Sequence, residues 1–94
     1  MSATAATAFS RAVEAHLRML RDERRASPHT VEATARDLAA FAAYCAQAGI
    51  DDPERVSVHQ VRGWMTRLHR DGHQPVSLQR YLSSVRSFYR YRLQ

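Results

Sequence analysis

The chain has 94 residues, 45% of them hydrophobic, with one cysteine and a formal net charge of +5. This length supports a single domain with a modest core, and one cysteine excludes a disulfide framework or a cysteine-based zinc cluster. The first eight residues lack the basic start and long apolar run of a signal peptide, and no later stretch has the length of a membrane span. We therefore expect a soluble, cytoplasmic protein of one domain.

Positive charge is concentrated in the second half of the chain. All 14 basic residues are arginines, and residues 1–56 hold seven of them against eight acids. Residues 57–94 hold the other seven against a single acid, Asp71. The planar fork of arginine suits bidentate contact with phosphate, so this balance indicates an anionic polymer as partner. Residue usage in a GC-rich genome is the alternative explanation for the lack of lysine.

Apolar periodicity predicts four helices, and no stretch is typical of a strand. Alanine, leucine and arginine, which dominate the composition, favour helix. Ser27 before Pro28 marks one helix start, Ser57 with Gln60 has the spacing of a capping box, and Gly49 is the expected left-handed C-terminal cap. After a loose tail over residues 1–8, a domain over 9–94 would contain helices at about 9–25, 28–48 and 57–71, and a fourth from 75 to about 90.

The second predicted helix has a clear inner stripe and a mixed outer face. The stripe consists of Val31, Ala35, Leu38, Ala42 and Cys45, flanked by Phe41. The residues expected to point directly away from it are His29, Ala33, Arg36 and Ala40. Glu32 and Asp37 are expected near this outer face, which would make it mixed in charge.

The fourth predicted helix has an outer face without acids. Its inner stripe consists of Leu78, Leu82, Val85 and Tyr89, with Tyr81 and Phe88 beside them. Opposite lie Val76, Arg80, Ser83, Ser87 and Arg90, flanked by Gln79 and Arg86. Serine and glutamine donate hydrogen bonds without repelling phosphate, so this face is predicted to bind an anion, with a plain solvated face as the alternative.

The sequence contains no recognisable motif for catalysis or for metal binding. His69 and His73 have a helical metal spacing, but Gly72 separates them where the third helix should end. His16 lies beside the apolar stripe of the first predicted helix and is expected to be a packed side chain. Gly63, inside the third predicted helix, indicates that a neighbouring element packs closely against that helix. No metal, cofactor or catalytic residue is expected, so the chain is interpreted as a binding module for a nucleic acid or, alternatively, for a protein.

Several segments, taken in order, resemble one family. Ser27-Pro28-His29-Thr30-Val31, then Arg36-Asp37-Leu38 and Phe41, resemble the opening helices of tyrosine recombinases of the phage-integrase superfamily, most closely the Xer type. The run from Arg80 to Arg90, with its leucine-serine and arginine-serine-phenylalanine-tyrosine segments, is similar to a signature of the same family. The resemblance covers about residues 9–92.

The resemblance implies an all-α, compact four-helix bundle, the SAM-like core-binding domain that clamps the recombination site. It implies that the second and fourth helices approach the major groove, with His29, Thr30 and Ala33 on one and Val76, Ser77 and Arg80 on the other. With the charge pattern, this predicts phosphate contacts from Thr30, Arg36, Arg80 and Arg86 and base contacts from Ser77, Gln79 and Arg80. Ser83 lies on the same predicted face.

The expected partners are double-stranded DNA and a catalytic domain of the same enzyme, with no membrane role. None of Tyr44, Tyr81, Tyr89 or Tyr91 can be assigned as the nucleophile, so this chain would be an excised domain or a free-standing relative. We expect it to be a monomer in a bacterial, nucleoid-associated setting. The alternative is a small helical module for protein–protein interaction without a DNA role, and the resemblance does not separate Xer resolvases from phage or transposon integrases.

Overall fold

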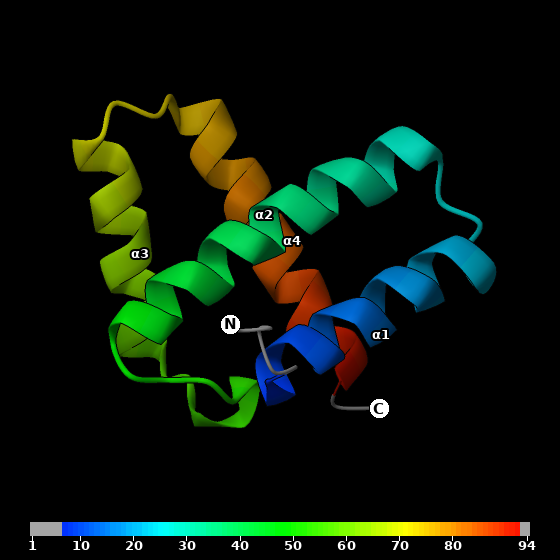
Figure 1. The fold of residues 1–94 in the computed structure, drawn as a ribbon. Coiled ribbons are helices and arrows are strands. Elements are labelled where there is room, and N and C mark those ends of the chain that lie inside the picture. The colour runs from blue at the N-terminus through cyan, green and yellow to red at the C-terminus, as the bar shows by residue number, and fades with distance from the viewer. Residues whose placement is uncertain (1–6, 93–94) are drawn as a thin grey trace, which may run out of the picture.

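The computed structural model describes residues 7–92, and all regular structure in that range is helical. The elements follow in the order α1 (Ala8–Asp22), α2 (Pro28–Gln47), the short 3-10 helix η1 (Pro53–Arg55), α3 (Val58–Arg70) and α4 (Pro75–Arg92). In Figure 1, α1 and α2 form a hairpin, α4 crosses behind α2, and α3 lies on the other side of the crossing. The predicted all-α, compact four-helix architecture is confirmed.

Local capping chemistry explains where the helices begin and end. Ser27 Oγ accepts a hydrogen bond from the Thr30 backbone N–H at 3.2 Å, and Gln60 Oε1 accepts one from the Ser57 N–H at 2.7 Å. Gly49 adopts the predicted left-handed conformation, with φ of +80°. The start of α1 was predicted less well, because Thr7 is its N-cap and Ala8 is already helical. Residues 1–6 of the predicted tail lie outside the described range.

Aromatic side chains from all four helices meet in the core. The Phe9 ring of α1 contacts Phe41 of α2 with 5.8 Å between ring centroids, and Phe41 contacts Trp64 of α3 at 5.1 Å. The Phe9 ring also stacks on Phe88 of α4 at 6.2 Å. Phe41 and Phe88 are fully buried, and Phe9 and Trp64 are 2% exposed. These large rings fix the helices relative to one another, since each buries apolar surface against at least one other helix.

Gly63 allows α3 to approach α2 closely, as the sequence predicted. A Cβ atom at this position would lie against the Tyr44 hydroxyl and within 3.5 Å of the ring carbon Cζ. Val58 is 64% exposed, because it begins α3 at the edge of a groove described below. No helix within residues 7–92 is long and apolar enough to cross a membrane.

Candidate nucleic-acid interface

The outer face of α4 carries most of the predicted DNA contacts. Gln79, Arg80, Ser83 and Arg86 are exposed, Val76 is 75% exposed, and Ser77 is half-buried. Arg80 and Arg86 are about 120° apart around the helix axis. Between them lies an arc of small, polar and basic side chains, and α4 contains no aspartate or glutamate. The predicted acid-free face is therefore present on the helix itself.

The first half of α2 supplies a second exposed segment. His29, Thr30 and Arg36 are exposed, whereas Ala33 is half-buried. The Thr30 Oγ1 atom accepts a hydrogen bond from Ser27 Oγ at 3.1 Å, so its hydroxyl is held at the start of the helix. The N-terminal end of a helix carries partial positive charge, which favours an approaching anion. Ala33 and Ala40 were both predicted to point directly away from the core and are half-buried instead.

Asp37 is the main departure from the sequence prediction. It was placed near the solvated outer face of α2, but it is 1% exposed. Its Oδ1 accepts a hydrogen bond from Arg80 Nη2 at 3.0 Å, and its Oδ2 accepts bonds from Arg80 Nε at 3.3 Å and Ser84 Oγ at 2.8 Å. The prediction was wrong because α4 crosses α2 at Asp37, and its residues Arg80 and Ser84 cover the carboxylate.

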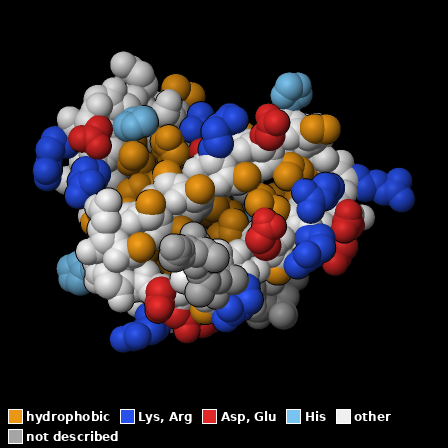
Figure 2. All heavy atoms as spheres, in the orientation of Figure 1, with side chains coloured by type: hydrophobic (Ala, Val, Ile, Leu, Met, Phe, Trp, Pro, Cys, Tyr) orange, Lys and Arg blue, Asp and Glu red, His pale blue; other side chains and the backbone are white. Residues whose placement is uncertain are grey.

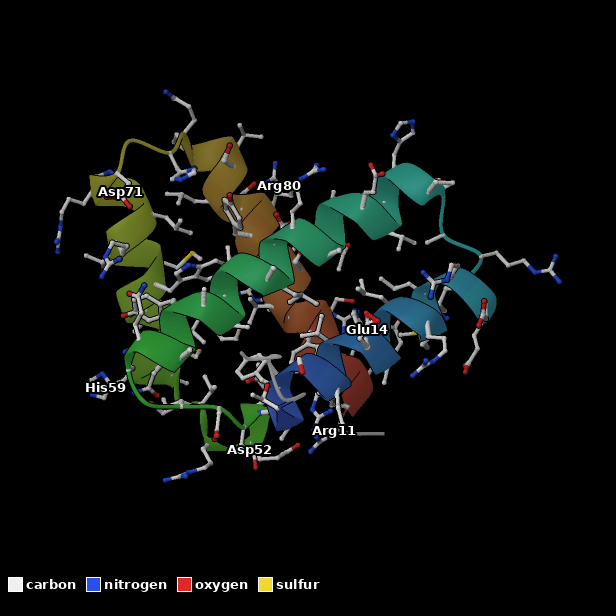
Figure 3. The ribbon with its side chains drawn as sticks, in the orientation of Figure 1. Arg11, Glu14, Asp52, His59, Asp71 and Arg80 are labelled. Carbon is white, nitrogen blue, oxygen red and sulfur yellow. The ribbon has the colours of Figure 1, made fainter. Side chains whose placement is uncertain are left out.

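Arg80 stays partly in solvent while it holds this carboxylate. Its side chain is 52% exposed, and Figure 3 shows it in the angle between α4 and α2. Its guanidinium carbon lies 4.8 Å from the centroid of the Tyr81 ring. The hydrogen bond to Asp37 raises the pKa of Arg80 further above its usual range, so the guanidinium is charged at every working pH. Asp37, Tyr81 and Ser84 are the residues that sequence reasoning missed as neighbours of a candidate contact.

Arg80 and Arg86 lie on opposite borders of the α4 face. Arg80 lies beside α2, whereas Arg86 lines a groove between α3 and α4. This groove has a volume of about 900 Å³ and is mostly apolar, and it includes Arg62, Val58 and Met65 of α3. The structure therefore places Arg80 against α2, a contact that the sequence did not predict, and Arg86 toward α3.

Charged groups elsewhere on the molecule are more mixed in sign. Figure 2 shows acidic and basic side chains interspersed over α1 and the start of α2. Asp71, the one acid of residues 57–94, lies at the end of α3 and away from Arg80 (Figure 3). Within the described range no group of three or more His, Cys, Asp or Glu side chains could hold a metal ion.

His16 and Cys45 are buried and belong to the core. His16 is 5% exposed, packs edge-on against Phe88 at 5.6 Å between ring centroids, and has a pKa lowered by burial. Burial likewise raises the pKa of the Cys45 thiol to about 11. The prediction that His16 is a packed side chain is confirmed.

Comparison with known proteins gives one family for nearly the whole chain. Residues 13–94 match the family described as "Phage integrase, N-terminal SAM-like domain". The chain is 44% identical over 83 residues to tyrosine recombinase XerC of Pseudomonas putida strain KT2440, an alignment that covers 88% of this chain and 28% of that protein. It is 42% identical over 81 residues to the XerC of Azotobacter vinelandii, covering 86% and 27% of the two chains.

The XerC of Xanthomonas campestris pv. campestris strain B100 is 44% identical over 78 residues, covering 83% of this chain and 24% of that protein. No solved structure gave a significant match. The chain thus spans about a quarter of the length of these curated relatives. The helical architecture, the arrangement of α2 and α4, and the match over residues 13–94 lead to one conclusion. The chain belongs to the phage integrase N-terminal SAM-like domain family.

Proposed function

We propose that this chain is the DNA-clamping domain of a tyrosine site-specific recombinase and binds duplex DNA through the exposed faces of α2 and α4. The observation that carries the proposal is the outer face of α4, which is basic, contains no carboxylate of its own, and meets α2 at Arg80. The names of the relatives, tyrosine recombinase XerC, support the same reading.

The exposed residues divide into two kinds of contact. Arg36, Arg86 and the Thr30 hydroxyl would bind phosphates, which position a protein on the duplex and supply most of its affinity. Ser77, Gln79 and Arg80 would meet base edges in the major groove. The remaining members of the face suit close approach to the groove walls, with Val76 able to contact a thymine methyl group. They are His29, Ala33, Val76 and Ser83.

The strand-exchange chemistry would lie outside this chain. A tyrosine recombinase cuts DNA through a phosphotyrosyl intermediate, and we place its catalytic residues in a separate domain that would grip the other face of the site. This chain would act as the other half of the clamp, without a cofactor and as a monomer in isolation, in the bacterial cytoplasm at the nucleoid. Because it supplies half of the contacts, we expect its own affinity for DNA to be weak.

A gel-shift titration at several salt concentrations tests the proposal. The logarithm of the association constant should fall linearly with the logarithm of salt concentration, with a slope of about −0.9 for each phosphate neutralised. Arg36→Ala and Arg86→Ala should each reduce the slope by about that amount on every DNA sequence. Arg55→Ala is the matched control, because Arg55 is an exposed arginine in η1, outside the α2–α4 face.

A salt-independent affinity, or an equal effect of Arg55→Ala and Arg86→Ala, would contradict the phosphate contacts.

A second function, protein–protein interaction, is favoured by one observation, the apolar groove between α3 and α4 with its exposed Val58. The variant Val58→Asp separates the two functions. It should leave DNA binding unchanged if α2 and α4 form the interface.

A further inference from the structure

The ion pair between Asp37 and Arg80 uses one particular edge of the guanidinium. Arg80 donates from Nε and Nη2 to the two carboxylate oxygens, at 3.3 and 3.0 Å. A guanidinium has five N–H donors in a rigid plane. This side-on pairing uses one N–H of Nε and one of Nη2, so both N–H groups of Nη1 and the second N–H of Nη2 stay outside the pair, at the end of the side chain. Since the Arg80 side chain is 52% exposed and the Asp37 side chain 2% exposed, that end is the part that can reach a ligand.

Other contacts fix the plane in which this end lies. Ser84 Oγ donates to Asp37 Oδ2 at 2.8 Å, so a second residue of α4 holds the carboxylate in addition to Arg80. The guanidinium carbon of Arg80 also lies over the Tyr81 ring, 4.8 Å from its centroid. Tyr81 is itself braced edge-on by Trp64 at 5.3 Å and by His73 at 5.5 Å between ring centroids. The position of the arginine is thus set before any ligand binds.

Pairing also changes what kind of DNA contact Arg80 can make. Arg80 and Asp37 together carry no net charge. Contact between the pair and a phosphate would therefore release few counterions from the DNA and add little to the affinity. Two parallel N–H donors nevertheless remain at the outer end, and they match the O6 and N7 acceptors that guanine presents in the major groove. A neutral but directional donor pair suits base recognition better than backbone binding.

We propose that Asp37 and Ser84 are positioning residues that make Arg80 a reader of guanine in the major groove rather than a phosphate contact. This inference rests on the DNA-binding function proposed above and adds a specificity device to it. It replaces the expectation that Arg80 serves both phosphate and base. It also explains why a carboxylate is tolerated within a surface meant for DNA, since Asp37 is buried behind the arginine that it orients.

The test is a selection from a pool of duplexes with a randomised central block, followed by affinity measurements on the selected and unselected pools. The wild-type chain should select guanine at one position, and Arg80→Ala should reduce that preference by about 5- to 150-fold, the range for one bidentate contact. Asp37→Asn should lose a similar preference while binding unselected DNA as well or better, with a salt slope steeper by about 0.9. Ser84→Ala should weaken the preference and leave the slope unchanged.

Arg86→Ala is the matched control and should lower affinity on every sequence with the guanine preference intact. The inference is overturned if Asp37→Asn and Ser84→Ala keep the full preference. It is also overturned if either variant loses the same factor on both pools in step with a lower melting temperature, which is the mark of a purely structural role. Ser84→Ala keeps the ion pair, so it decides the matter even if Asp37→Asn does not fold. A flat salt dependence of the wild-type chain would instead refute DNA binding itself.

Discussion

Removing Arg80 should destabilise the fold as well as alter DNA binding, because it leaves a buried carboxylate with one remaining partner. The side chain of Asp37 is 2% exposed, and after Arg80→Ala it would keep only the Ser84 hydroxyl among its three hydrogen bonds. Breaking a fully buried ion pair from one side costs about 3–5 kcal/mol. Arg80 is 52% exposed, so water can take its place and screen the carboxylate, which roughly halves that figure to about 2 kcal/mol.

Urea and thermal unfolding measure this loss directly. For a domain of this size, about 2 kcal/mol corresponds to a fall in melting temperature of roughly 8–16 °C. The double variant Asp37→Leu/Arg80→Leu should lie within about 1 kcal/mol of wild type, because it removes both charges and fills the space with apolar atoms. Losses that simply add in the double variant, or a loss below about 0.5 kcal/mol for Arg80→Ala, would refute the buried-pair reasoning.

Three further predictions concern the core. Burial lowers the pKa of His16, so below about pH 6.5 the unfolded chain binds more protons than the native one. The free energy of unfolding should therefore be full above that pH and decline below it. Thermal melts from pH 8 to 5 should show a smaller decline for His16→Leu. Cys45 is fully buried with a pKa of about 11, so a thiol reagent should label it far more slowly in the native than in the urea-unfolded chain, and equal rates would contradict its burial. Gly63→Ala should be close to neutral alone, but should add up to about 1 kcal/mol of stability in a Tyr44→Phe background, where the hydroxyl that blocks the new methyl group is gone.

Local signals in the sequence were sufficient to predict most of the fold. Ser27 before Pro28, Gly49 and the Ser57–Gln60 pair set helix ends through bonds between residues no more than a few positions apart. Such signals need no knowledge of tertiary packing. The resemblance to one family then implied a SAM-like arrangement of these helices, and the comparisons support that family over residues 13–94.

The environment of Arg80 could not be predicted in the same way. A helical stripe divides residues into inside and outside, but α2 packs against α1 on one side and is crossed by α4 on another. Asp37 lies under that crossing, 43 positions before its partner Arg80. A useful signal was present, since Arg80 and Ser84 are four residues apart on one side of α4 and can therefore hold the same group. Only the crossing of α2 and α4 shows which group that is.

The charge imbalance between the two halves of the chain gains a structural meaning from this crossing. Asp37 and Glu54 belong to the acid-rich first half, and their partners Arg80 and Arg92 belong to the basic second half. Folding therefore uses acids from one half to hold arginines of the other in place. Arg86 and Arg90 are also exposed on α4, and among residues 7–92 neither forms an ion pair with an acid. A single helix therefore carries two kinds of arginine. Arg80 is fixed and neutralised by its acid, which suits it to reading a base, whereas Arg86 and Arg90 keep their full charge, which suits them to phosphate.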